Sequence, residues 1–214
     1  MRRHPEKHPI LYAGRPVTLI ILAGGRSRRM KRDKAGLPMP EGTLLERILI
    51  QAEGYFEEIL ISLSAGQKIS VGGSKLPPGR RPAVRRVEDE VPGQGPMAGI
   101  LAGLKAASHG VCAVIACDIP DIHLNLMRRL VRQAEKYDVV VPLSPSGLVE
   151  PLFAVYRRRV RVKMQKLLDS GQRSLLPLLD AVRTCRLPLG SSARLKNLNT
   201  PDEYLSFLKS LRTD

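Results

Sequence analysis

The chain has 214 residues, 43% of them hydrophobic and 26% charged, which is typical of a globular protein and excludes a disordered or fibrous chain. We expect a single domain over residues 1–214, with residues 1–15 as a flexible basic tail. No apolar run approaches the ~20 residues that cross a bilayer, and no signal-peptide core follows the basic N-terminus. The cysteines match neither a zinc site nor a disulfide framework, so we expect a reduced, cytoplasmic protein; they are Cys112, Cys117 and Cys185.

The charge is strongly positive: 35 Lys and Arg residues stand against 20 Asp and Glu residues, a formal charge of +15. Such an excess attracts anions, whether nucleic acid, acidic membrane surfaces or phosphorylated small molecules. It is concentrated in the first 35 residues, which hold ten basic and two acidic side chains. Aromatic residues make up only 4% and there is no Trp, so stacking platforms for single-stranded nucleic acid are scarce. A solvated basic surface is the alternative interpretation for most of these charges.

In the first half of the chain, short apolar runs alternate with segments of helical periodicity. Strands are expected at 17–22, 58–63 and 83–87, and helices at 44–52 and 96–108, the latter rich in Ala and Gly. Residues 64–82 are rich in Gly, Pro, Lys and Arg, and are expected to form a mobile excursion around a short strand at 68–71.

The alternation continues in the second half. Strands are expected at 110–116, 138–142, 151–156 and 185–187, and helices at 124–136, 158–169, 174–181 and 201–212. Thr200, Pro201 and Glu203 fit the N-cap, first helical position and capping-box acid of the last helix. Strands alternating with helices predict a three-layer α/β/α sandwich on a mostly parallel sheet, whose ligands bind beyond the carboxyl ends of the strands.

The first candidate site follows the first long strand. Gly24 and Gly25 let the backbone approach a ligand, and successive N–H groups there can bind an anion. The loop that follows is basic and ends at Asp33-Lys34, of which Lys34 is singled out. The pattern is neither a Walker loop nor a dinucleotide fingerprint, because the Gly-Lys-Ser/Thr ending and the third glycine are missing. A glycine pair after a strand is also common without any function.

Two carboxylates follow other strands at the same expected edge of the sheet. Asp118 comes after the most apolar strand, where a carboxylate facing a phosphate would hold Mg²⁺. Asp89 ends another strand. Each could instead serve only a turn or a helix cap.

Two amides, Asn197 and Asn199, precede the last helix and suit either capping or a substrate rich in donors and acceptors, such as a pterin. The histidines are scattered, so neither a zinc enzyme nor a Ser-His-Asp hydrolase is supported. They are His4, His8, His109 and His123.

Five segments in order resemble the MobA-type molybdenum cofactor guanylyltransferases, from about Val17 to the last helix. They are Leu22-Ala23-Gly24-Gly25-x-Ser27-x-Arg29-Met30-x-x-Asp33-Lys34, Gly95 to Leu104, Cys117-Asp118-Ile119-Pro120, Pro151 to Tyr156, and Asn197-Leu198-Asn199-Thr200-Pro201. The resemblance implies a Rossmann-like nucleotidyltransferase fold. It also implies Mg²⁺-dependent transfer of GMP from GTP to the terminal phosphate of Mo-molybdopterin, giving molybdopterin guanine dinucleotide and pyrophosphate.

The resemblance also assigns residues. Catalytic candidates are Lys34, Asp118 and Arg29. Nucleotide-binding candidates are Leu22, Ala23, Gly24, Gly25, Lys34, Asp89 and Asp118. Asp118 is the metal ligand, and Asn197 and Asn199 lie on the acceptor side. The chain departs from the family pattern at Ser62, where the family has Asn, and at Lys31, where it has Gly.

Several other interpretations remain open. Relatives of the same fold include molybdopterin cytidylyltransferases, 2-phospholactate guanylyltransferases and sugar-phosphate nucleotidyltransferases. The Ala23-Gly24-Gly25 loop favours guanine, because cytidylyltransferase relatives tend to have Ala at the position of Gly24. A basic nucleic-acid-binding module without catalysis is the alternative of another class. Contacts with molybdenum-cofactor delivery proteins or molybdoenzymes are also implied.

Overall fold

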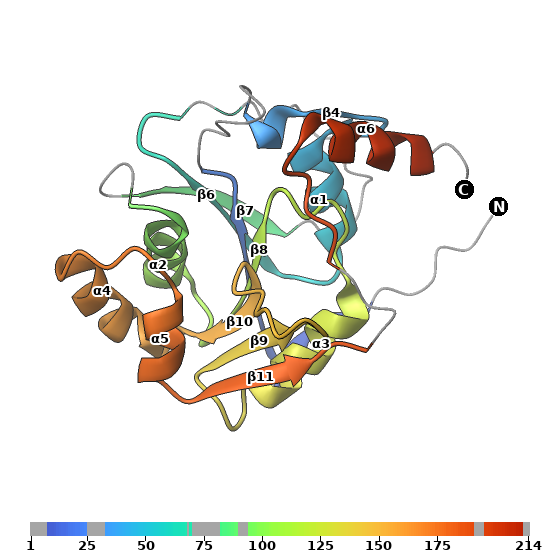
Figure 1. The fold of residues 1–214 in the computed structure, drawn as a ribbon. Helices are drawn as coiled ribbons and strands as arrows, with labels where there is room; N and C mark the ends of the chain where they lie inside the picture. The colour runs from blue at the N-terminus through green and yellow to red at the C-terminus, as the bar shows by residue number, and fades with distance from the viewer. Residues whose placement is uncertain are drawn as a thin grey trace.

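The computed structural model describes residues 8–24, 33–67, 69, 82–89, 94–190 and 195–211. Its centre is a seven-stranded sheet in the order β11-β9-β10-β8-β3-β6-β7 (Figure 1). The strands are β3 (Thr18–Leu22), β6 (Glu58–Leu63), β7 (Ala83–Glu88), β8 (Val111–Ala116), β9 (Val139–Leu143), β10 (Phe153–Arg157) and β11 (Thr184–Pro188). Neighbours pair in parallel except at β10, which is antiparallel to both β8 and β9. The expected mostly parallel sheet is thus confirmed, with one reversed strand.

Helices cover both faces of the sheet and complete the three layers (Figure 1). On one face lie α1 (Leu44–Ala52) and α3 (Leu124–Gln133); on the other lie α2 (Pro96–Ala106), α4 (Arg161–Asp169) and α5 (Leu176–Ala181). A short 3-10 turn, η2 (Arg158–Val160), precedes α4, so the single helix expected at 158–169 begins less regularly than its periodicity predicts.

The core is divided by the alternation of side chains along the central strands. In β3, Leu19 and Ile21 pack with the helices on one face, whereas Ile20 and Leu22 pack with those on the other. Every residue of β3, β6 and β8 is buried. Continuous apolar runs are what a strand covered on both faces requires, which is why these strands could be predicted from the sequence.

The small residues of α2 allow it to lie close to the sheet. A Cβ placed on Gly103 would come within 2.7 Å of the Ile20 side chain. This contact fixes α2 against β3, so the N-terminus of α2 stands beside the carboxyl end of that strand.

The N-terminal region differs from the expected flexible tail. Leu11–Tyr12 (β1) and Arg15–Pro16 (β2) pair as an antiparallel hairpin, and Ile10 is buried. The tail prediction is therefore wrong for this hairpin: burial of Ile10 and the ladder between the strands compensate for the entropy of ordering them. Residues 1–7 lie outside the described residues.

The last helix, α6 (Pro201–Ser210), packs on the outside of the α1 layer. Its first turn has the expected capping box: the Thr200 hydroxyl accepts from the Glu203 N–H, and the Glu203 carboxylate accepts from the Thr200 N–H. Phe207 and Leu198 join a small apolar cluster with Leu37, Met39 and Leu44. Met39 belongs to the short strand β4 (Pro38–Met39), which pairs with β5 (Gly42–Thr43).

Two expectations fall outside the described residues: most of the excursion at 64–82, with its short strand at 68–71, and the basic loop at 25–32. In the described part of the chain, no helix has the length and apolar character to cross a membrane.

Candidate active site

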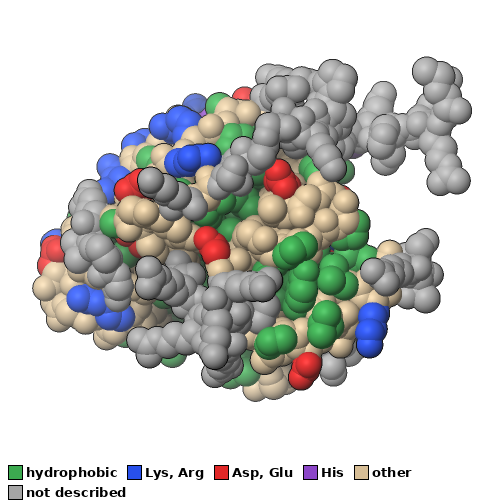
Figure 2. Space-filling model, turned by 90° about the horizontal axis from the view of Figure 1, so that it is seen from above, with side chains coloured by type: hydrophobic (Ala, Val, Ile, Leu, Met, Phe, Trp, Pro, Cys, Tyr) green, Lys and Arg blue, Asp and Glu red, His purple; other side chains and the backbone are tan. Residues whose placement is uncertain are grey.

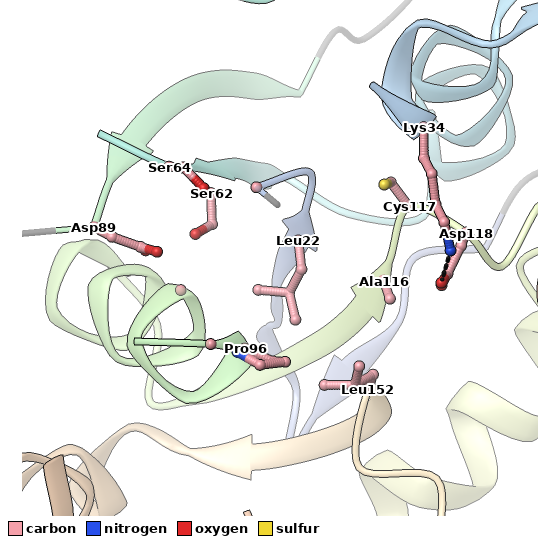
Figure 3. Close-up of a pocket in the computed structure, with 13 residues that line it drawn as sticks. Leu22, Lys34, Ser62, Ser64, Asp89, Pro96, Ala116, Cys117, Asp118 and Leu152 are labelled. Carbon is pink, nitrogen blue, oxygen red and sulfur yellow. Dashed lines mark hydrogen bonds and ion pairs between the residues drawn. The ribbon is translucent and has the colours of Figure 1, made fainter. Parts of the chain in front are cut away.

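A pocket of about 400 Å³ opens at the carboxyl edge of the sheet, beside the N-terminus of α2. Its lining comes from the ends of β3, β6, β7 and β8, from the start of α2, from Lys34 and from the residue before β10. These residues are Leu22, Gly24, Lys34, Ser62, Ser64, Asp89, Gly95, Pro96, Gly99, Ala116, Cys117, Asp118 and Leu152 (Figure 3). Figure 2 looks down on the molecule from above and shows acidic and hydrophobic side chains around a hollow, with Lys and Arg gathered towards one side.

Polar groups gather at two ends of this pocket. Asp89 and Ser62 lie at one end, and Lys34 and Asp118 lie at the other, with Leu22 between them (Figure 3). Lys34 and Asp118, which were expected at one edge of the sheet, are in direct contact. The pocket therefore offers two chemically different subsites.

Lys34 makes two close contacts at its end of the pocket. Its Nζ donates to Asp118 Oδ2 and to Asn199 Oδ1, each at 2.8 Å. The ion pair is largely shielded, with side-chain exposures of 15% for Lys34 and 21% for Asp118. Asn199 thus joins the two predicted charged groups, whereas it was expected only on the acceptor side.

Local structure holds each member of this cluster. Lys34 begins a 3-10 turn, η1 (Lys34–Gly36), which Asp33 caps by accepting from the Ala35 N–H at 3.0 Å. The Asp118 carbonyl accepts from the Leu198 N–H at 2.8 Å, so the segment before α6 is bound directly to the backbone of Asp118. The Cys117 N–H itself donates to Leu22 O at 3.0 Å.

Asp89 occupies the other subsite in an unusual electrostatic state. Burial raises the pKa of its carboxyl group to about 6, and a hydrogen bond from Ser62 acts in the opposite direction. Its Oδ1 atom is buried and has no hydrogen-bond partner within the described residues. A buried oxygen is costly while it stays unpaired, and it is available to accept from a ligand N–H.

Two further acidic and sulfur groups lie near Asp118. Burial, followed by the negative charge of Asp118, raises the pKa of Glu150. The same two causes raise the pKa of Cys117 to about 12, which keeps its thiol neutral and unreactive near pH 7. Glu150 was not predicted from the sequence, although it directly precedes the Pro151 segment that carries the family resemblance.

The glycine that opens the loop after β3 lies tightly against the end of β6. A Cβ on Gly24 would meet Ser64 N at 2.8 Å and Ser64 Oγ at 3.0 Å. The Ala23 N–H donates to Ser62 O at 2.9 Å, so β3 and β6 stay joined up to this point. A close approach of this kind requires glycine.

The remaining predicted residues divide into two groups. Gly25, Arg29 and Lys31 lie outside the described residues. Ala23, Asn197 and Asn199 are described but are not among the residues that line the pocket. The buried Oδ1 of Asn197 lacks a hydrogen-bond partner among the described residues. Ser62, which stands where the family has Asn, lines the pocket beside Asp89.

The residues at the Lys34 end fit a magnesium ion held together with phosphates. Two oxygen atoms, from Asp118 and Asn199, already converge on one positive group, the Lys34 ammonium. Within the described ranges, no cluster of three or more His, Cys, Asp or Glu side chains could enclose a metal ion. Mg²⁺ commonly takes one or two carboxylates and completes its shell with phosphate oxygens and water.

This fold, with its pocket beyond the strand ends, is that of the Rossmann-like nucleotidyltransferases, and solved structures share it. Molybdopterin-guanine dinucleotide biosynthesis protein A from Archaeoglobus fulgidus matches with a TM-score of 0.75 and 21% identity, over 92% of this chain and 100% of that one. A 2-C-methyl-D-erythritol 4-phosphate cytidylyltransferase from Thermus thermophilus matches with a TM-score of 0.67 and 19% identity, over 92% and 99%.

The chain belongs to the MobA-like NTP transferase domain family, whose model matches residues 19–183. It is therefore a nucleotidyltransferase. A "probable molybdenum cofactor guanylyltransferase" from Mycobacterium marinum is 35% identical over 189 residues, covering 85% of this chain and 88% of the relative. A protein of the same name from Pelotomaculum thermopropionicum is 40% identical over 141 residues, covering 66% and 63%.

Proposed function

We propose that this enzyme transfers GMP from GTP to the terminal phosphate of Mo-molybdopterin, with Mg²⁺, in the cytoplasm. The observation that carries the proposal is the cluster in which Lys34 Nζ contacts both Asp118 and Asn199 at one end of a pocket of nucleotide size. The names of relatives that span most of the chain support the choice of substrates.

The Asp89 end of the pocket suits the guanine base. A carboxylate can accept from two N–H groups on the same edge of guanine, N1–H and the exocyclic amine. The Oδ1 atom of Asp89, which has no partner in the described ranges, is an acceptor of this kind. The backbone of Leu22, Ala23 and Gly24 would then support the nucleoside between the two ends of the pocket, because Gly24 leaves room for close approach.

The Lys34 end suits the triphosphate. In the transfer, an oxygen of the acceptor phosphate forms a bond to the α-phosphorus of GTP while the bond from that phosphorus to the bridging oxygen breaks, and pyrophosphate leaves. Negative charge is spread over the phosphate oxygens at that point, so a fixed ammonium group lowers the barrier. Mg²⁺ held by Asp118 would neutralise phosphate charge in the same region.

The acceptor needs no strong general base. A phosphate monoester is already anionic near pH 7, so the enzyme has to position two anions and offset their repulsion. The described pocket lining contains no histidine, and the Cys117 thiol stays neutral. Asn199 would meet the acceptor, since it contacts Lys34 from the α6 side. Asn197, nearby in the chain, has an amide oxygen with no hydrogen-bond partner in the described part of the chain.

Nucleotide binding provides the first test. The thermal unfolding temperature is measured with each of the four NTPs, with and without Mg²⁺. GTP with Mg²⁺ should raise it and the other three nucleotides should not, because only guanine offers Asp89 its paired N–H donors. A response to CTP alone would overturn the choice of guanine.

Turnover provides the second test. Pyrophosphate release from GTP is measured with molybdopterin, and with inorganic phosphate as a control acceptor. Release that depends on molybdopterin and Mg²⁺ is expected. Binding of GTP without release on adding molybdopterin would overturn the proposed acceptor while leaving the nucleotide assignment intact.

A further inference from the structure

Gln67 lies in a tight turn just beyond β6, outside the residues assigned so far. Its N–H donates to Ser64 O at 2.9 Å, which closes the turn over residues 64–67. The Gln67 side chain is partly buried and points back towards the ends of the strands, because its amide reaches the backbone of Ala23.

The amide of Gln67 uses all of its main hydrogen-bonding groups at once. Its Nε2 donates to Ala23 O at 3.1 Å and to Asp33 Oδ2 at 2.7 Å, while its Oε1 accepts from the Ser64 N–H at 3.1 Å. Ala23 O and the carboxylate can only accept, and the Ser64 N–H can only donate. The orientation of the amide is therefore fixed by its partners.

The two acceptors lie on either side of the basic loop. Ala23 directly follows β3, and Asp33 directly precedes Lys34. Asp33 uses its two oxygens separately: Oδ1 caps the turn that carries Lys34, and Oδ2 binds Gln67. One side chain from the turn after a neighbouring strand thus joins the two flanks of the loop and sets where the Lys34 turn begins.

We propose that Gln67 is a positioning residue for the nucleotide, which holds the flanks of the loop together so that the Lys34 ammonium faces the triphosphate. This inference rests on the proposed function. The Gln67 amide also donates a hydrogen bond to the Asp33 carboxylate, which stabilises that negative charge where a polyanion would arrive.

The test compares Gln67→Leu with the wild-type enzyme. Leu keeps an apolar stem of similar size but removes all three side-chain hydrogen bonds. Isothermal titration calorimetry with GTP and Mg²⁺, and steady-state kinetics, should show that the GTP Kd and KM rise about tenfold, with the molybdopterin KM unchanged. Gln165→Leu is the matched control: its amide binds Asp169 on the exposed side of α4, so it should change neither constant.

A charge variant separates positioning from folding. Gln67→Glu places a carboxylate against Asp33 and should weaken GTP binding more than Gln67→Leu does. Adding Asp33→Asn should recover part of the loss, because the Asn amide can donate to the introduced carboxylate and its oxygen can still cap the turn. This pair of variants decides the question even where Gln67→Leu fails to fold.

The outcomes are distinguishable. If the wild-type enzyme binds GTP and Gln67→Leu or Gln67→Glu binds it equally well, the inference is overturned and the proposed function stands. A lowered unfolding temperature without any change in the GTP Kd also overturns it, because the role is then only structural. If the wild-type enzyme binds no GTP, the proposed function fails first, and the inference fails with it.

Discussion

Two buried carboxylates lie at opposite ends of the neighbouring strands β6 and β7, and their surroundings differ sharply. Glu58 begins β6 and accepts from the Thr18 hydroxyl at 2.6 Å and from the Ser108 N–H and hydroxyl at 2.9 and 2.8 Å, besides Arg85. Burial by itself raises the pKa of Glu58, but these donors lower it to about 2. Asp89, just beyond β7, has a pKa raised to about 6 and one oxygen without a partner among the described residues.

The comparison distinguishes a carboxylate that serves the fold from one that is available to a ligand. The hydrogen-bond donors to Glu58 are all groups of the protein itself. One of them, the Thr18 hydroxyl, also contacts the His109 ring, so the hydrogen bonds continue from Glu58 to His109. Thr18 gives its single hydroxyl hydrogen to Glu58, so the His109 Nδ1–H must be the donor to Thr18 Oγ1 at 2.9 Å. The carboxyl edge leaves the Asp89 acceptor unpaired among the described residues, which is what an enzyme needs where substrate donors arrive.

The largest expected effect comes from the Lys34 end of the pocket. Lys34→Ala and Asp118→Ala should each lower kcat/KM about 10²–10³-fold, because each removes a charge that stabilises the transition state. Pyrophosphate release with GTP, Mg²⁺ and molybdopterin measures it. Circular dichroism should show an intact fold, and Lys163→Ala on the exposed side of α4 should keep the wild-type rate. Near wild-type turnover in either site variant would refute the assigned roles.

The second largest effect is expected at Glu58, the carboxylate at the amino end of β6. Its removal should lower stability and leave catalysis unchanged. Glu58→Gln should lower the free energy of unfolding by about 1–3 kcal/mol at pH 7, since charge-assisted hydrogen bonds to a buried group are lost. The pKa of Glu58 is lowered from 4.5 to about 2 on folding, so its contribution is present above pH 4.5 and is lost as the pH falls towards 2.

Urea unfolding at pH 7 and at pH 3 tests this. The difference in stability between wild type and Glu58→Gln should shrink at the lower pH. Arg85→Ala, whose side chain is half exposed, should cost less than about 1 kcal/mol. A Glu58→Gln enzyme that is as stable as wild type but inactive would contradict the assignment of Glu58 to stability and of Asp89 to ligand binding.

A third prediction uses the pH dependence of GTP binding. Because the pKa of Asp89 is raised to about 6, its carboxyl group is ionised above pH 6 and neutral below it. The GTP Kd should therefore rise about tenfold per pH unit below pH 6. Ser62→Ala should move the onset of this rise to higher pH, because the hydrogen bond from Ser62 lowers the pKa of Asp89. Calorimetric titrations of GTP from pH 5 to 8 measure the Kd of the wild type and of Ser62→Ala. In Asp89→Asn the Kd should not change with pH. A pH dependence that persisted in Asp89→Asn would exclude Asp89 as its source.

The smallest expected effect concerns the capping box that holds Asn199. Thr200→Ala should lower the free energy of unfolding by about 1 kcal/mol, because the Glu203 N–H loses its acceptor. Thr43→Ala, in the corresponding box of α1, is the matched control and should cost a similar amount. Only Thr200→Ala should also raise the molybdopterin KM, since Glu203 accepts from the Asn199 N–H at 2.7 Å. An equal effect of both variants on that constant would contradict the link.

The sequence predicted the elements whose burial pattern is regular. The continuous apolar run of β8 is typical of a buried strand, and the Thr200–Glu203 pair is typical of a capping box. The structure contains both. The hairpin around Leu11 was missed because its stability comes from Ile10 packing on distant residues. The reversed direction of β10 has no local signal either, so the position of Leu152 in the pocket wall could not be foreseen.

The sequence indicated which residues lie at the candidate site better than it indicated which of them are in contact. Lys34 and Asp118 were expected together because parallel strands end at one edge. The contact of Asn199 with Lys34 depends on the Leu198 N–H reaching the Asp118 carbonyl, a tertiary hydrogen bond that no spacing reveals. Gln67 and Glu150 were overlooked because neither falls in a motif, and only the folded chain brings them beside charged groups.

The contact between Lys34 and Asn199 joins residues 165 positions apart. During synthesis on the ribosome, the sheet from β3 to β8 can assemble while the segment before α6 is still untranslated. Lys34 could then meet Asp118 but not yet Asn199. Asn199 therefore reaches Lys34 only after most of the chain has been translated, and the contacts of the Lys34 ammonium are completed together with the segment that leads into α6.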